Sequence, residues 1–261
     1  MDIFHNNNTV PSPDDSRDWT AESIYDSRLS LPEYVDHRNK LQAVRNQGHQ
    51  GSCAAQTAAC MKEWQENKDI GFNNYMSPQY IYNNRSNQNS EGMFGRDVMK
   101  ILSKKGCCFE KTYPYLTIEK PEMIKDEANE EASNFKIKSY AQINTIEGLK
   151  KALYINGPCY ISFPVYNDTV TMWKQRPGDK RQGGHAMTGV GYDDIGFMIR
   201  NSWGPFWGND GYCTYPYSDW GSHWEVWTTI DDDSFKFKND DPKPIENDKK
   251  VKSCCGWFFK K

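Results

Sequence analysis

The pattern of hydrophobic and polar positions changes near residue 135. Before this point, small and apolar residues recur at helical spacing. After it, short β-branched and aromatic runs are separated by Gly, Pro, Asn or Asp. This change predicts an α+β fold of two lobes, with a helical lobe at about 31–134 and a β lobe at about 135–230.

Three segments of the first half have the features of helices. Residues 53–67 are rich in helix formers, and their small side chains suit a closely packed central helix. In the second segment, Ser77 is a typical N-cap and Pro78 stands at the first helical position. The third segment, 95–106, is amphipathic and ends on Gly106.

The second half predicts a run of strands with one short helix, at 145–157, inserted between two of them. The predicted strands lie within 135–143, 158–166, 185–193, 196–203, 211–217 and 223–230.

The two ends of the chain differ from the part between them. Residues 1–30 are polar and lack sustained periodicity, so we expect an extended arm with at most a short helix within 18–29. Residues 231–261 are rich in charge and contain prolines, which is typical of a tail. The expected organisation is therefore an N-terminal extension at 1–30, one two-lobed domain at 31–230 and a charged tail at 231–261.

Charge and composition exclude several functional classes. The net charge of -3 and the pI near 6.0 give no bias towards nucleic acid, and none is expected as a partner. No stretch approaches the ~18 apolar residues of a membrane span. The N-terminus lacks the basic and apolar regions of a secretory signal, which favours an intracellular or particle-associated location over conventional secretion.

The cysteines do not form a metal-binding pattern. Eight are present, two pairs of them adjacent in sequence, and no CxxC occurs. The five histidines form no HxxxH or similar array. We therefore expect neither a metal site nor another cofactor.

Cys53 stands in the loop "NQGHQGSCAAQ", just before the first predicted helix. Three interpretations of its sulfur are open at this point: a small buried apolar group, half of a disulfide, or a nucleophile. A helix N-terminus stabilises a thiolate, which favours the nucleophile. The Cys53 backbone N–H and the Gln47 amide would then stabilise an oxyanion, since Gly48 and Gly51 let the loop fold back.

A nucleophilic thiol also needs an imidazole, and His185 has the most suggestive setting of the five histidines. It follows two glycines at the start of a predicted strand. Asn201, at the end of the next strand, can orient the ring, and Trp203 can shield their hydrogen bond from water. The alternatives are a strand-end histidine with a structural role and an asparagine that only forms a turn.

These segments together resemble the papain family of cysteine peptidases. The matching motifs are "QGHQGSCA", "GHAMTGVGYD" and "NSWGPFWGNDGY", in the family's order. The interval from Cys53 to His185 falls within the ~130–150 residues typical of the family. "LPEYVDHRNKLQAVRNQG" resembles the start of a mature enzyme, and "TYPY" adds further agreement. The resemblance runs from about residue 31 to 230.

The resemblance implies a papain-like fold with the active-site cleft between the two lobes. It also implies an endopeptidase that cleaves extended polypeptides through a thioester intermediate. In this scheme Cys53 is the nucleophile, His185 the general base and acid, Asn201 the residue that orients it, and Gln47 part of the oxyanion hole. Substrate contacts would come from Gly92, Met93, Gly184, Ala186 and Trp203.

Three positions depart from the family pattern. Ala54 replaces the tryptophan after the nucleophile, Gln50 replaces a disulfide cysteine, and His37 replaces the tryptophan of a D-W-R motif. We expect Ala54 to reshape the cleft and leave the catalytic residues in place. The alternatives are an inactive module that only binds peptides, and a thiol acyl-transferase or isopeptidase of the same fold.

The two ends also bear on function. Residues 1–30 are too few for the family's long helical pro-region, so they are expected to be a short autoinhibitory pro-segment of a zymogen, crossing the cleft in the unprimed or reversed direction. The terminus "VKSCCGWFFKK" is compatible with a membrane or partner contact through acylated Cys254 or Cys255. A tail without that role is the favoured interpretation.

Overall fold

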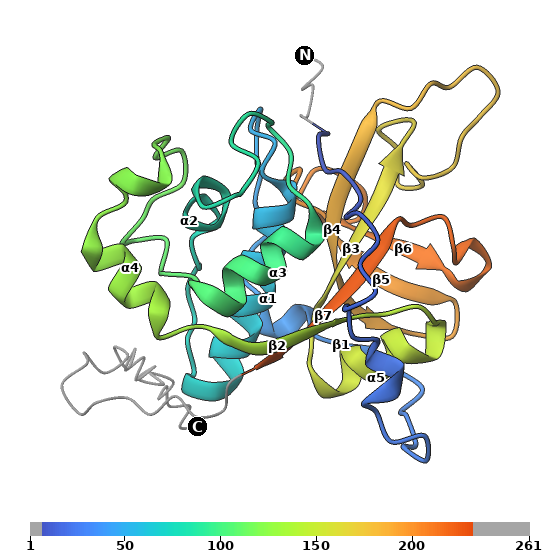
Figure 1. Ribbon diagram of the computed structural model, residues 1–261. Coiled ribbons are helices and arrows are strands. Elements are labelled where there is room, and N and C mark those ends of the chain that lie inside the picture. Colours follow the sequence, from blue (N-terminus) through green and yellow to red (C-terminus); the bar gives the residue numbers. More distant parts are fainter. Residues whose placement is uncertain (1–6, 232–261) are drawn as a thin grey trace, which may run out of the picture.

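Helices and strands separate into two groups in space, as the sequence predicts (Figure 1). The computed structural model describes residues 7–231. The helices are α1 (Cys53–Ile70), α2 (Pro78–Asn83), α3 (Gly95–Lys104), α4 (Asp126–Ser133) and α5 (Ile146–Ile155). The strands are β1 (Val35–Asp36), β2 (Ile137–Gln142), β3 (Cys159–Val165), β4 (Gly183–Tyr192), β5 (Gly196–Arg200), β6 (Tyr212–Pro216) and β7 (Glu225–Asp231).

Helix α1 is the central element of the helical lobe. Every residue from Cys53 to Glu66 is buried, which explains its lack of an amphipathic pattern. Its small residues let α2, α3 and β4 approach closely. The helix ends at Gly71, whose positive φ of 67° suits glycine and whose N–H bonds to the Asn67 carbonyl.

The other predicted helices form close to their expected limits. The Ser77 hydroxyl accepts the Tyr80 N–H, and Pro78 occupies the first turn of α2. Helix α3 ends at Lys104, and Gly106 follows it with a φ of 82°. Helix α4 and strand β1 were missing from the prediction because α4 is mostly polar and β1 is only two residues long.

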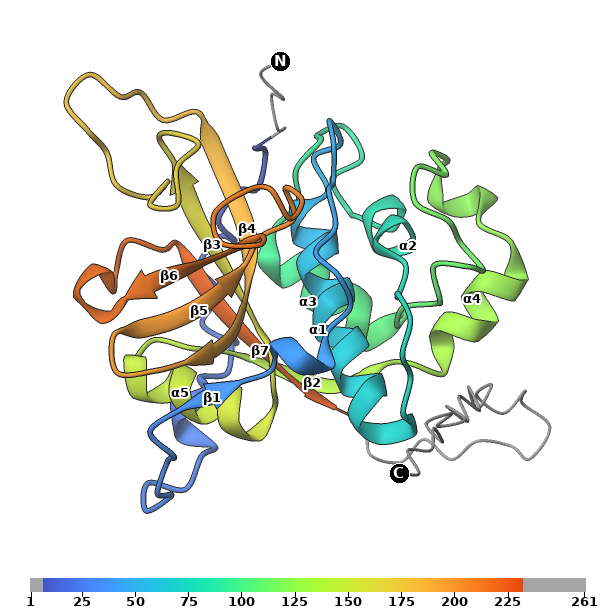
Figure 2. The same ribbon diagram turned by 180° about the vertical axis from the view of Figure 1, so that it is seen from behind.

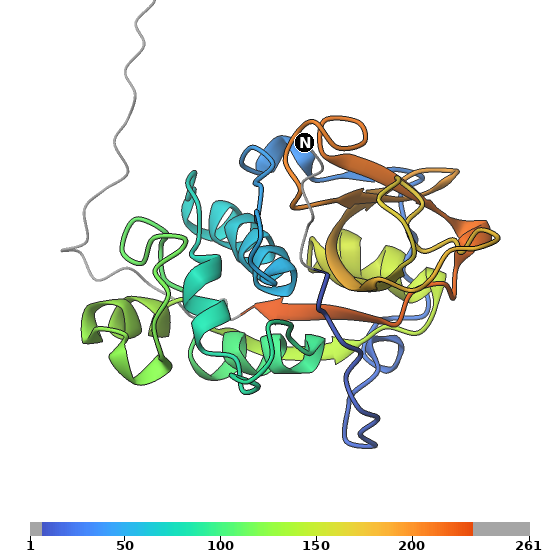
Figure 3. The ribbon, with the colours of Figure 1, turned by 90° about the horizontal axis from the view of Figure 1, so that it is seen from above.

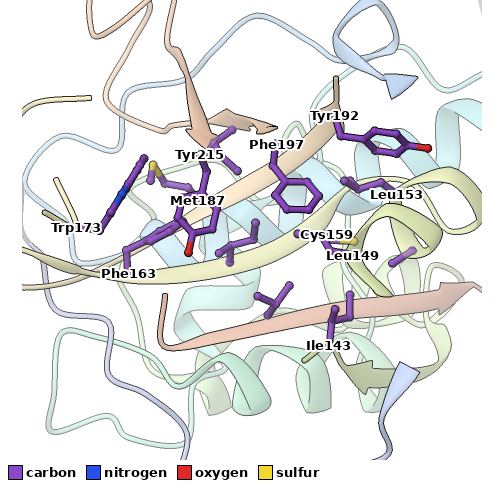
Figure 4. Close-up of a cluster of buried hydrophobic side chains, with 14 of the residues drawn as sticks. Ile143, Leu149, Leu153, Cys159, Phe163, Trp173, Met187, Tyr192, Phe197 and Tyr215 are labelled. Carbon is purple, nitrogen blue, oxygen red and sulfur yellow. The ribbon is translucent and has the colours of Figure 1, made fainter. Parts of the chain in front are cut away.

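The strands form one antiparallel sheet in the order β2-β7-β3-β4-β5-β6. The short strand β1 pairs with the end of β4, at Gly191 and Tyr192. Each of the six predicted strand segments overlaps one of these strands, although β4 begins two residues before its segment and β7 ends one residue after its segment. The core of the β lobe is rich in rings; Phe163 stacks on Trp173 with a centroid separation of 4.9 Å (Figure 4). Helix α5 covers this core with Leu149 and Leu153 (Figure 4).

Strand β7 connects the two lobes. Its Trp227 is buried in the hydrophobic cluster of the helical lobe, and its Thr229 hydroxyl accepts the Gln65 amide of α1 at 3.0 Å. The Lys62 ammonium of α1 is fully buried, with Glu66 at 2.7 Å and Asp231 of β7 at 3.2 Å. These contacts fix the helix that begins at Cys53 against the sheet that carries His185.

Replacing Lys62 by Met should lower the free energy of unfolding by about 3 kcal/mol or more, because two carboxylates then share a buried space without a counterion. Urea denaturation measures this change. Lys68 on the same helix is the matched control, since it is half exposed and pairs with a neighbouring Asp69. Its replacement by Met should change stability by less than about 0.5 kcal/mol. Equal losses in the two variants would contradict the assigned role of Lys62.

Candidate active site

His185 and Asn201 form a buried hydrogen-bonded pair on adjacent strands. His185 lies in β4, and Asn201 directly follows β5, so the pairing of these strands brings the side chains together. His185 Nε2 is 2.7 Å from Asn201 Oδ1. The same oxygen accepts the Ser202 backbone N–H at 2.7 Å, which identifies it as the oxygen of the amide. His185 Nε2 must therefore carry the proton of this bond.

Trp203 covers the pair as the sequence suggested. Its ring lies 4.5 Å from the imidazole of His185, centroid to centroid, with a tilt of 32°. All three side chains are nearly inaccessible to solvent. A hydrogen bond in such surroundings meets little competition from water.

Cys53 is the first residue of α1, as the sequence predicts. Its sulfur lies near the backbone N–H groups of Cys53, Ala54 and Ala186, which favour the thiolate. Complete burial acts in the opposite direction and is the larger effect, so the pKa of the thiol is raised. Because Ala186 follows His185 in β4, its contact places the sulfur beside the histidine strand.

Gln47 is held in a loop that folds back on the start of α1. Its backbone N–H donates to the Ser202 carbonyl at 2.8 Å, and its Oε1 accepts the Ser202 hydroxyl at 2.7 Å. Its Nε2 donates to the Gln50 carbonyl at 3.0 Å, which leaves the second N–H of this group for another acceptor.

Tyr115, of the "TYPY" motif, supports the same loop. Its hydroxyl donates to the Gln47 carbonyl at 2.8 Å and is 2.6 Å from the Ser52 hydroxyl, immediately before Cys53. The sequence signalled Tyr115 only through its motif, and the role of Ser202 was missed.

An N-terminal segment of the chain occupies the groove over Cys53. In Figures 1 and 3 this segment, in dark blue, runs along the boundary between the two lobes. The Thr9 hydroxyl is 2.9 Å from the Cys53 sulfur, and both side chains are almost completely buried. The sequence predicts an arm in the cleft but gives no indication that Thr9 reaches the sulfur.

The segment pairs with residues that were predicted to bind substrate. Thr9 N–H donates to the Gly184 carbonyl at 3.0 Å, and Val10 N–H donates to the Met93 carbonyl at 3.4 Å. The segment forms two β-bridges, from Asn8 to Gly184 and from Val10 to Phe94, and in both the two chain segments run parallel. A side chain at Gly92 or Gly184 would overlap the backbone of residues 8 and 9, so glycine at these positions permits the close approach.

Cys60, His223 and His37 lie outside this arrangement. Cys60 is buried within α1, and its thiol pKa is raised to about 11 by burial. His223 packs against Trp220 and bonds to the Tyr215 hydroxyl. His37 bonds to the Leu153 carbonyl and contacts Trp64 edge-on. The contacts of all three side chains indicate a structural role.

Gln50 and Ala54 lie where the sequence places them, in the loop and in the first turn of α1. The Gln50 carbonyl accepts the Gln47 amide, and Ala54 is fully buried in the core of the helical lobe. The six cysteines among the described residues are free thiols, namely Cys53, Cys60, Cys107, Cys108, Cys159 and Cys213.

Within residues 7–231, no helix is long and apolar enough to cross a membrane, and no group of His, Cys, Asp and Glu side chains could hold a metal ion. The terminus with Cys254 and Cys255 lies outside the described residues, so its proposed contact stays a prediction from sequence.

Comparison with known proteins agrees with this geometry. The model of the papain family cysteine proteases matches residues 31–223. An uncharacterised peptidase C1-like protein of Acanthamoeba polyphaga mimivirus is 30% identical over 74% of this chain and 70% of its own length. Papain of Carica papaya is 26% identical, over 73% of this chain and 56% of papain. This chain thus spans little more than half of the papain sequence.

Solved structures show the same fold. Xylellain, a cysteine protease from Xylella fastidiosa, superposes with a TM-score of 0.75 at 28% identity, over 87% of this chain and 96% of that one. Digestive procathepsin L 3 of Tenebrio molitor, at 18% identity, has a TM-score of 0.63 over 78% of this chain and 71% of its own. The chain therefore belongs to the papain family of cysteine proteases and has the family's two-lobed α+β fold.

Proposed function

We propose that the protein is a cysteine endopeptidase that hydrolyses extended polypeptides and that its own N-terminal segment keeps it latent. One observation carries the proposal. A cysteine at the start of a buried helix lies beside a histidine strand whose imidazole is oriented by Asn201, and an extended segment already occupies the groove over this cysteine.

The arrangement supports a two-step acyl transfer. His185 Nδ1 takes the proton of the Cys53 thiol, because Nε2–H is bonded to Asn201. The thiolate attacks the substrate carbonyl, and the Cys53 N–H and Gln47 Nε2–H stabilise the oxyanion. The imidazolium returns its proton to the leaving amine, which gives a thioester. Water, deprotonated by His185, then hydrolyses the thioester and regenerates the thiol.

Residues 7–12, which we name the plug, are placed to block this chemistry. The group facing the sulfur is the hydroxyl of Thr9 and not a peptide carbonyl. The plug runs parallel to its partners at Gly184 and Phe94. With the plug in place, burial raises the pKa of Cys53 and outweighs the hydrogen bond from the Thr9 hydroxyl, which favours the thiolate.

Residues 18–25, which we name the strap, have a different character. Asp18 forms a mostly buried ion pair with Arg96, and Ala21 is buried in the core of the β lobe. The Glu22 carboxylate accepts the N–H groups of Asn144 and Thr145 at the start of α5. The strap therefore contributes to the folded domain, and only the plug is positioned for removal.

Between the plug and the strap, residues 13–17 are mostly exposed, and the Arg17 side chain is 85% exposed. Release of the plug by a cut in this segment would preserve the contacts of the strap with Arg96, with the core of the β lobe and with the start of α5. The family resemblance begins at residue 31, but the structural boundary of the inhibitory segment lies before Asp18.

A protein that starts at Asp18 should hydrolyse peptides and react with a thiol-directed epoxide at least ~100-fold faster than the full chain. The reason is that removal of the plug uncovers Cys53. Fluorogenic peptides and mass spectrometry of the labelled protein measure the two effects.

The matched controls separate the activity from the latency. Cys53→Ala in the shortened protein should abolish both signals. A protein starting at Leu31 also lacks the strap and should unfold at a lower urea concentration. Equal labelling of Cys53 in the full and Asp18-start chains would reject latency, and labelling without hydrolysis would favour the binding module.

Gly92→Ala should displace the plug in the full chain, because the new methyl group overlaps the Asn8 carbonyl oxygen. Labelling of Cys53 should then become at least ~10-fold faster, as the closed state loses population. Gly189→Ala is the control, since its methyl group meets only the flexible end of Ile161 at 3.1 Å. A labelling rate that is the same in both variants and in the unmodified chain would contradict the assigned position of the plug.

A further inference from the structure

The Asn201 amide has two ends with different surroundings. Its oxygen accepts two hydrogen bonds, from His185 and from Ser202. Its Nδ2 is buried and has no hydrogen-bond partner among the protein groups of residues 7–231. Burying an amide N–H without a partner is costly, so the nitrogen should have one that is not a protein group.

A small cavity is lined by Asn201, and none of the plug residues contributes to its lining. Its volume is about 10 Å³, which is room for one water molecule. Polar side chains from both lobes line it, among them Gln56, Thr57, Glu63, Thr188, Arg200 and Asn201. A polar cavity of this size satisfies both conditions for a buried water, which are sufficient space and several hydrogen-bonding groups.

Gln56 is the unusual member of this lining. It lies on α1 one turn after Cys53, where a long amide side chain stands among alanines. It is 5% exposed, and its side chain lies within hydrogen-bonding range of the Tyr115 hydroxyl, but its Oε1 has no hydrogen-bond partner among the described residues. The Gln56 oxygen and the Asn201 nitrogen both lack a partner among the described residues, and their side chains, one from each lobe, line the same space for one water.

Neighbouring groups can complete the coordination of this water. Burial raises the pKa of Glu63 to about 7, so near neutral pH its carboxyl can both donate and accept. Gln56 and Arg45 also line a larger surface groove of about 570 Å³ next to Tyr115. These two side chains thus separate the cavity from solvent, and the water can exchange past them.

We propose that Gln56 is a positioning residue, which holds the Asn201 amide through one buried water so that Asn201 Oδ1 stays directed at His185. The water accepts from Asn201 Nδ2 and donates to Gln56 Oε1. The helix that carries Cys53 is thereby linked to the residue that orients His185. The kinetic part of this inference rests on the proposed peptidase function, whereas the structural part does not.

The first measurement is made on the full chain and needs no activity. The proton on His185 Nε2, hydrogen-bonded to Asn201, should give a resolved downfield NMR signal. In Gln56→Met, which has a similar volume and no acceptor oxygen, this signal should move upfield and exchange faster with solvent. Gln56→Glu keeps an acceptor oxygen and should return the signal towards its original position.

Gln65→Met is the matched control. Gln65 is also a buried glutamine of α1, but its amide bonds to Thr229, far along the helix from the site. This variant should lose stability to urea and leave the His185 signal unchanged. A His185 signal that is the same in Gln56→Met and in the unmodified chain would overturn the proposal, as would an equal change in Gln65→Met.

The second measurement is made after cleavage of the full chain at a protease site placed within 13–17. Gln56→Met should lower kcat about 5- to 20-fold with little change in KM, because the water acts on the catalytic pair and not on substrate binding. An increase in KM at constant kcat would overturn the proposal. If the NMR signal moves as expected but no variant hydrolyses peptides, the peptidase function fails and the positioning role of Gln56 stands.

Discussion

Everything at this site depends on how the first turn of α1 is packed against β4. The helix is buried on all sides, so its N-terminus cannot shift without disturbing both hydrophobic clusters. This constraint presents the Cys53 sulfur to backbone N–H groups of its own helix and to that of Ala186. The buried charges at Lys62, Glu66 and Asp231 fix the other half of the same helix to β7.

The same packing explains how the site tolerates its departures from the family pattern. Ala54 follows Cys53 where the family pattern has a tryptophan, yet the His185–Asn201 bond and the cover of Trp203 are formed entirely by the β lobe. The loop that carries Gln47 is likewise bonded to Ser202 and Tyr115, and neither of these hydrogen bonds involves residue 54. In Figure 2, which shows the molecule from behind, α1 lies next to β4.

In the proposed scheme, one N-terminal segment serves both latency and stability. The plug makes backbone hydrogen bonds that any extended peptide could make, so it resembles a ligand. The strap makes contacts that depend on its own side chains, such as the Asp18–Arg96 ion pair and the Glu22 carboxylate at the start of α5. In this scheme the folded domain itself anchors the short segment that covers Cys53.

The sequence by itself determined the α+β class, the limits of most elements and the identity of Cys53, His185, Asn201 and Gln47 as the candidate site. Periodicity and turn residues are local properties, and the motifs surround chemically distinctive side chains. Only the tertiary structure decided that Thr9 meets the Cys53 sulfur, that the strap belongs to the domain and that Gln56 and Asn201 share one cavity. These relations join residues far apart in the chain, and their physical basis is burial, which no local pattern of residues encodes.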